Sequence, residues 1–135
     1  MANYYATCRS NYFKVKDPVA FTSWCLRCSL EFFESERHDG LYAIASNDAD
    51  GAGWPSQRDD AAGNELEEFD MVAELATHLS EGCVAILMES GHEKLRYVTG
   101  VAIAVNAKGQ ITQITLEDIY DKAAALGDVL TRCEY

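Results

Sequence analysis

Gly82–Leu116 reads GCVAILMESGHEKLRYVTGVAIAVNAKGQITQITL and carries the longest run of strand-forming residues in the chain. This run predicts three strands, over residues 83–88, 94–105 and 111–116, because β-branched and other apolar residues dominate each of them. Turns are expected at Ser90–Glu93 and at Asn106–Gly109, where Gly109 can take a positive φ. Such short connections indicate an antiparallel meander, since a parallel pair needs a crossover of about a dozen residues or more.

The residues before the meander predict a strand, a helix and two more strands. Residues 4–16 favour a strand, and Asp17-Pro18 is typical of a helix start, because Asp accepts backbone N–H bonds and Pro suits the first helical position. This helix is expected to end near Ser29 and to bury one stripe of side chains, Phe21, Trp24, Cys25 and Cys28. Residues 30–36 and 41–45 then predict strands joined by a turn at 37–40.

The remaining segments complete an α+β pattern. Residues 46–65 show no periodicity and predict an irregular acidic loop, and Phe69–Leu79 predicts a helix. Thr115–Asp118 resembles a capping box for a last helix that ends at Gly127, after which the tail is expected to dock through Val129 and Leu130. The expected order is β-α-β-β-α-β-β-β-α, an antiparallel sheet with two or three helices packed on one face. A ferredoxin-like split core is one way to close it.

Length and composition indicate one globular domain. The chain has 135 residues, of which 48% are hydrophobic and 24% are charged. Its apolar runs are all shorter than the ~20 residues that span a bilayer, and its first residues lack the pattern of a signal peptide. We therefore expect a cytoplasmic protein without a membrane partner. Its five cysteines are accordingly expected to be reduced thiols, most of them in the core.

The net charge of −11 is concentrated in the middle of the chain. Residues 31–70 carry twelve acidic and two basic side chains, whereas residues 1–30 carry one acidic and four basic side chains. A negative field of this kind repels phosphate backbones and attracts basic surfaces. The charge pattern therefore argues against direct nucleic-acid binding and favours a basic protein partner.

Motifs for catalysis, metal or cofactor binding are weak. Cys25-Leu26-Arg27-Cys28 is a CxxC that lacks a second Cys or His pair, so we interpret both thiols as core residues. Asn47–Gly51 resembles part of a calcium loop, but Gln57 stands where an EF-hand needs its bidentate Glu. His38, His78 and His92 are scattered. We therefore expect no cofactor, no metal site and no catalytic residue.

The acidic segment offers the best candidate for a binding site. Trp54-Pro55 is a large rigid aromatic unit in an otherwise polar, Gly-rich stretch, and Trp is enriched among residues that anchor interfaces. Acidic residues around it would speed the encounter with a basic partner. The candidate partner-binding residues are Trp54, Asp48, Asp50, Asp59, Asp60, Glu65, Glu67 and Glu68. A solvated loop that only aids solubility is the alternative.

Two stretches carry a resemblance to other proteins. Asn3–Asp17 (NYYATCRSNYFKVKD) and Glu93–Asn106 (EKLRYVTGVAIAVN) are similar to small acidic proteins of bacterial phages, plasmids and integrative elements. The resemblance implies an inhibitor of host defence, of the anti-CRISPR or antirestriction kind, which blocks a basic nucleic-acid-binding groove.

These observations lead to one hypothesis and one alternative from another class. The hypothesis is a non-enzymatic interaction module whose acidic middle third occupies a basic surface of a partner, such as a nucleic-acid-binding enzyme or a toxin. The alternative is a small enzyme or ligand-binding domain with a site between residues 46–65 and the sheet. The sequence leaves the oligomeric state open.

Overall fold

The computed structural model describes residues 4–46, 53–94 and 97–133. Its elements form an antiparallel sheet, a separate two-stranded hairpin and three helices. In chain order they are β1 (Tyr4–Ser10), β2 (Phe13–Lys14), α1 (Pro18–Arg27), β3 (Leu30–Glu34), β4 (Leu41–Ser46), β5 (Gln57–Asp59), β6 (Leu66–Glu68), α2 (Met71–His78), β7 (Val84–Glu93), β8 (Tyr97–Asn106), β9 (Ile111–Thr115), α3 (Asp118–Ala123) and a 3-10 turn, η1 (Ala124–Leu126). The predicted α+β class is therefore confirmed.

The first half of the sheet has the split β-α-β arrangement. Neighbouring strands run β3-β4-β1-β7, and every pair is antiparallel. Thus β4 lies between β1 and β3, the two strands that α1 connects, and β1 lies between β4 and β7, the two strands that α2 connects. This is the topology of a ferredoxin-like core. The short strand β2 continues along the same edge of β4 that β1 contacts at Arg9↔Ala45.

The meander extends this core by two strands. β7 pairs with β8 from Val84↔Asn106 to Glu93↔Tyr97, and β8 pairs with β9. The predicted turn at Ser90–Glu93 is wrong, because these residues continue β7 and pair with both β1 and β8. The strand runs on to Glu93, and Lys94 follows it with a φ of 52°. The predicted turn at Asn106–Gly109 is confirmed by the Gly109 N–H bond to the Asn106 carbonyl, at 2.9 Å.

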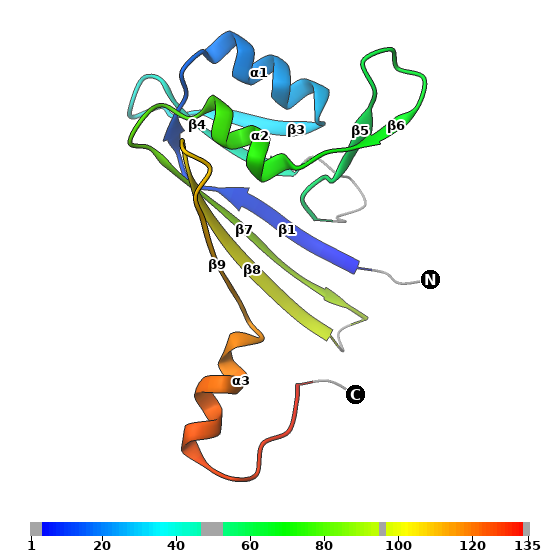
Figure 1. The fold of residues 1–135 in the computed structure, drawn as a ribbon, viewed down its shortest axis with the longest axis vertical. Coiled ribbons are helices and arrows are strands. Elements are labelled where there is room, and N and C mark those ends of the chain that lie inside the picture. Colours follow the sequence, from blue (N-terminus) through cyan, green and yellow to red (C-terminus); the bar gives the residue numbers. More distant parts are fainter. Residues whose placement is uncertain (1–3, 47–52, 95–96, 134–135) are drawn as a thin grey trace.

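Helices α1 and α2 cover one face of the sheet and enclose the core (Figure 1). The Asp17 carboxylate accepts the N–H groups of Val19 and Ala20, as a helix N-cap should. The α1 stripe is buried as predicted, and Cys25 and Cys28 are 0% and 1% exposed. Other fully buried side chains from both layers are Phe21, Ile44, Leu75, Leu79, Leu87 and Val105. Among the described residues, no helix has the length and apolar character needed to cross a membrane.

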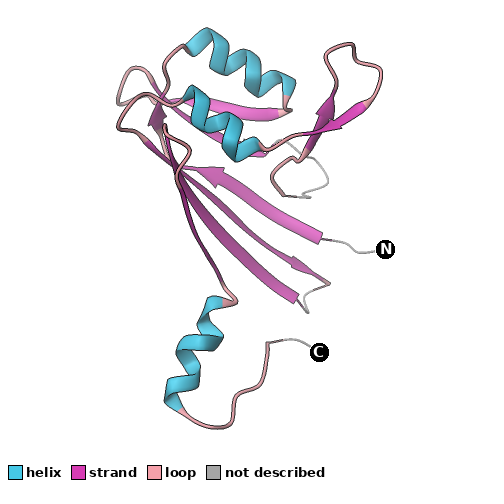
Figure 2. Ribbon diagram, in the orientation of Figure 1, coloured by secondary structure: helices cyan, strands magenta, loops and turns pink. Residues whose placement is uncertain are grey.

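Two helices pack on one face of the sheet, within the predicted two or three, because helix α3 does not bury the apolar face predicted for it. The Thr115 N–H donates to Asp118 Oδ2 at 2.8 Å, as in one of the two bonds of the predicted capping box, but the helix begins at Asp118 and its N-cap, Glu117, makes no side-chain capping bond. However, none of the residues from Asp118 to Ala123 is buried, and Val129 is 94% exposed. Figure 2 shows α3 beyond the ends of the strands, away from α1 and α2. The apolar residues of the predicted helix and tail therefore face outward and do not dock on the chain's own core.

Residues 46–65 are not wholly irregular. Gln57–Asp59 form β5, which pairs with β6 in a hairpin, and Ser46 ends β4. Periodicity could not reveal β5, because this two-stranded ribbon has no buried apolar face to impose an alternation. The predicted site residues Asp48 and Asp50 lie outside the described residues.

Candidate protein-interaction surface

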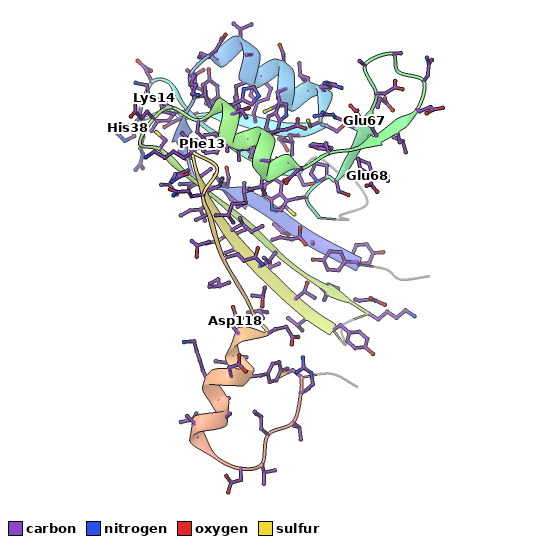
Figure 3. All side chains as sticks on the ribbon, in the orientation of Figure 1. Phe13, Lys14, His38, Glu67, Glu68 and Asp118 are labelled. Carbon is purple, nitrogen blue, oxygen red and sulfur yellow. The ribbon has the colours of Figure 1, made fainter. Side chains whose placement is uncertain are left out.

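The acidic hairpin β5–β6 contains most of the predicted site residues. Its strands pair at Gln57↔Glu68, Arg58↔Glu67 and Asp59↔Leu66. Because side chains alternate along a strand, Arg58 and Glu67 share one face and the other four residues share the opposite face. Figure 3 places Glu67 and Glu68 at one end of the molecule, well away from Asp118.

The inner face of the hairpin is fastened to both helices by ion pairs. Arg58 donates to Glu67 Oε1 at 3.0 Å and to Glu74 of α2 at 2.5 and 3.1 Å. Its guanidinium also lies 4.5 Å from the centre of the Phe69 ring. Arg27 of α1 donates to the same Glu67 oxygen at 2.6 Å. Glu67 is thus committed to two arginines, and its charge is largely compensated within the protein.

The electrostatics of this network keep its groups ionised. The hydrogen bond to Glu74 raises the pKa of Arg58 above its already high value. Burial alone would raise the pKa of Glu74, but hydrogen bonds from Arg58 and Trp24 outweigh burial and hold that pKa below its usual value. The hairpin is therefore attached to α1 and α2 by ion pairs whose groups stay charged across the neutral pH range.

The tip of the hairpin is organised by Asp60. Its Oδ1 accepts the N–H groups of Asn64 at 2.9 Å and of Ala62 at 3.1 Å. These backbone bonds, that of Asn64 first, lower the pKa of Asp60. Gly63 follows with a φ of 73°, a conformation that glycine adopts without strain. The Asp60 carboxylate therefore shapes the turn, although it remains negatively charged.

The outer face of the hairpin presents the exposed carboxylates. Asp59, Leu66 and Glu68 lie on this face and are exposed, Leu66 to 67%. Glu65, just before β6, is also exposed, although alternation places it on the Arg58 side of the hairpin. An apolar side chain surrounded by acids is the arrangement expected of a contact with a basic surface. Leu66 was not among the predicted site residues. The alternation in Glu65–Glu68, with an apolar residue in an acidic strand, is the signal that could have identified it.

Trp54 lies apart from these carboxylates. Its indole is half-buried and packs against the hydrophobic core, and its backbone N–H donates to Glu89 Oε1 at 2.9 Å. Gly53 before it has a φ of 100°, and a Cβ there would lie 2.7 Å from the same Glu89 oxygen. The structure therefore seats residues 53–54 against β7 and places Asp59, Glu65, Glu67 and Glu68 on the separate hairpin.

Glu89 gathers the polar groups that lie between residues 53–54 and the sheet. It accepts the Tyr4 hydroxyl at 2.8 Å and contacts the Cys8 thiol at 3.6 Å, while Tyr4 also bonds Thr99 at 3.0 Å. Burial, followed by the charge of Glu89, raises the pKa of Cys8 to about 12. Burial also raises the pKa of Tyr4. Both groups are therefore neutral at physiological pH, and Cys8 lacks the thiolate that a nucleophile needs.

Other candidate chemistry is dispersed. His38 is exposed before β4, His78 packs on Phe21 and Trp24, and His92 pairs with Tyr5 on the sheet. Within residues 4–46, 53–94 and 97–133, no three His, Cys, Asp or Glu side chains are grouped so that they could hold a metal ion. The structure thus brings Asp59, Asp60, Glu65, Glu67 and Glu68 together on one hairpin.

Comparison of the chain with protein-family models, with curated proteins and with solved structures yields no match in any of the three.

Proposed function

We propose that this protein is a non-enzymatic interaction module that occupies a basic surface of a partner protein through the exposed residues of the β5–β6 hairpin. The observation that carries the proposal is the exposed group Asp59, Glu65, Leu66 and Glu68 on a hairpin fastened by Arg58. Because these ion pairs hold the hairpin before binding, its presentation to a partner costs little ordering entropy. The partner we propose is a protein with a basic surface, such as a nucleic-acid-binding enzyme, as in anti-defence or toxin-immunity proteins.

The roles within this surface differ among residues. Asp59, Glu65 and Glu68 would accelerate the encounter, since exposed charges act mainly on association rates. Leu66 would supply the apolar contact that slows dissociation. Asp60 would add to the negative field while shaping the turn, and Glu67 would hold the hairpin in place through Arg27 and Arg58. Trp54, half-buried against the core, would contribute only through the accessible part of its ring.

The neutral state of Cys8 and Tyr4 favours this proposal over a small enzyme with a site at Glu89. A thiol with a pKa of about 12 has almost no thiolate at physiological pH, and its carboxylate neighbour disfavours ionisation further. The groups around Glu89 also satisfy one another through hydrogen bonds. They therefore act as a structural cluster that fixes residues 53–54 on the sheet.

The test is an affinity capture from bacterial lysate with two matched charge variants as bait. Asp59→Asn, Glu65→Gln and Glu68→Gln together remove three charges from the hairpin. The control, Glu31→Gln, Glu34→Gln and Glu36→Gln, removes the same charge from exposed residues in and beside β3. We expect the wild type and the control to retain the same basic partner and the hairpin variant to lose it. Equal retention by both variants would contradict the proposal.

Kinetics against the captured partner would separate charge from apolar contact. The hairpin variant should associate more slowly, and wild-type affinity should fall as salt rises, because screening acts over ~8–10 Å. Leu66→Ser should instead dissociate roughly tenfold faster, as expected for an interface residue worth about 1–2 kcal/mol. Binding that is insensitive both to salt and to these changes would place the contact elsewhere.

A further inference from the structure

The sheet has an outer face that α1 and α2 leave uncovered. Alternation along β7 buries Leu87 beneath the helices and points Met88 to the opposite side, where it is 57% exposed. Register places Met88, Ala102 and Ile114 in one row across β7, β8 and β9. Ile114 is 65% exposed, and Val98, on the same face, is 63% exposed. We call this surface, formed by Val84, Met88, Val98, Ala102, Ile114 and Leu116, the outer sheet face.

The C-terminal segment, residues 117–133, also carries apolar side chains that the rest of the chain does not cover. It is held together internally, by an ion pair between Arg132 and Glu117 and by the Cys133 N–H bond to the Tyr120 hydroxyl at 2.7 Å. Yet Leu126 is 90% exposed and Val129 is 94% exposed. A helix of six residues is not stable in water without tertiary packing. The segment therefore requires a surface that covers its apolar side chains.

The direction in which α3 leaves the sheet opposes docking on its own chain. The Leu116 N–H donates to the Gly100 carbonyl at 3.0 Å, which extends the β8–β9 ladder beyond Thr115. The Thr115 N–H bond to Asp118 then fixes the first turn of α3. These two bonds fix the path of the chain from the end of β9 into α3. Figure 1 shows the segment continuing past the strand ends.

The exposed surface area of the chain also indicates that a partner covers part of it. A compact monomer of 14.9 kDa exposes roughly 7,000 Å². This chain exposes 9260 Å², an excess of roughly 2,000 Å² over that scaling law. Two chains that each covered such an excess would bury about 4,000 Å² in total, within the range of obligate homodimers. The excess is therefore of the size that a second copy would remove.

We propose that two copies of this chain form a symmetric dimer in which the C-terminal segment of each lies on the outer sheet face of the other. Two-fold symmetry would bury both apolar surfaces of both chains at once, because each chain carries one C-terminal segment and one outer sheet face. A groove of about 870 Å³ between β8, β9 and α3, lined in part by Val98, Leu116 and Ile119, would close in the same contact. The hairpin β5–β6 takes no part, so this inference is independent of the proposed function.

The test measures the mass of the 135-residue chain by light scattering across a dilution series. We expect twice the 14.9 kDa of one chain. Met88→Glu on the face and Leu126→Glu on the segment should each weaken the dimer at least tenfold. Leu26→Glu, at a 72% exposed position on α1, is the matched control and should leave the dimer intact. Each chain carries a net charge of −11, so added salt should strengthen the dimer, whereas it should weaken binding through the hairpin.

A cross-linking experiment gives a result even if the glutamate variants do not fold. Ile114→Cys and Leu126→Cys are placed on separate chains that carry Cys83→Ser and Cys133→Ser, and the mixture is treated with bismaleimides of graded length. A covalent product that joins the two different chains supports the proposal. A monomeric mass at every concentration would overturn it. A dimer that both glutamate variants leave intact would also overturn it. So would a failure to cross-link the two different chains when a single chain that carries both Ile114→Cys and Leu126→Cys does form a cross-link within itself.

Discussion

Arg58 and Glu74 form a two-point ion pair, with Nη1 to Oε1 at 2.5 Å and Nη2 to Oε2 at 3.1 Å. This pair joins the second residue of β5 to the first turn of α2. The Arg58 side chain is 10% exposed, and its third bond goes to Glu67 on the neighbouring strand. One guanidinium therefore determines how the acidic hairpin is held against the helices, and this has a measurable energetic consequence.

Replacing Arg58 by Met should destabilise the protein by about 1–3 kcal/mol. The change keeps an unbranched apolar stem but removes the guanidinium that bonds Glu67 and Glu74, and partly buried acceptors that lose a hydrogen bond cost about this much. Urea denaturation would measure the loss. Arg37→Met, at an exposed position before β4, is the control and should cost less than about 0.5 kcal/mol. Similar losses for both variants would show that the ion pairs do not hold the hairpin.

Stability should fall as the pH drops below about 6.5, the usual pKa of histidine. Burial against Phe21 and Trp24 lowers the pKa of His78 in the folded state. Between the folded and unfolded pKa values the unfolded chain binds more protons, so the free energy of unfolding decreases with falling pH and levels off below the folded pKa. Urea denaturation from pH ~5 to ~7 would show this slope. His78→Gln should flatten it, and an unchanged slope would exclude His78 as its source.

The five thiols should differ sharply in reactivity. Burial raises the pKa of Cys8 and of Cys25 to about 12, and it also raises the pKa of Cys28. Cys133 is exposed and Cys83 is partly exposed. A thiol reagent followed by mass spectrometry should therefore label Cys83 and Cys133 first, and the other three only when the chain unfolds. Rapid labelling of Cys25 or Cys28 in the native protein would contradict their assignment to the core.

Leu87→Ala should cost about 2–5 kcal/mol, because it removes buried methyl groups and leaves a cavity beneath the helices. Leu87 is 1% exposed at the centre of β7. Leu26→Ala on α1 makes the same chemical change at a 72% exposed position and should cost less than about 0.5 kcal/mol. Thermal and urea unfolding of both variants would test which face of β7 is internal. A loss at Leu87 as small as that expected at Leu26 would mean that the core has been placed on the wrong side of the strand.

Local signals in the sequence were sufficient for much of the fold. Asp17-Pro18 predicted the start of α1 because the capping chemistry involves only neighbouring residues. The stripe of Cys25 and Cys28 identified the buried side of α1, since helical periodicity reports directly on burial. The acidic residues of the hairpin were also found from the sequence, because their charge is visible without any knowledge of the fold.

Features that depend on distant residues could not be predicted in the same way. Ser90-Gly91 suggested a turn, but a Cβ at Gly91 would collide with the Tyr5 carbonyl and with Ala6 across the β1–β7 pair. That glycine is needed for close packing against a strand more than 80 residues earlier, which local patterns do not report. Similarly, the apolar residues of α3 indicated a face to be buried, but not that the face lies away from the chain's own core.

The position of β1 governs when the protein can fold during synthesis. β1 lies in the middle of the sheet, with Tyr4 opposite Glu93. β1 must therefore wait for β7, and at ~5–20 residues per second this delay lasts several seconds or more. Throughout that interval the ribosome-bound chain exposes apolar strands, and the section it has already released includes residues 31–70, with their twelve acids. Mutual repulsion between such nascent chains would limit their aggregation before the sheet can close.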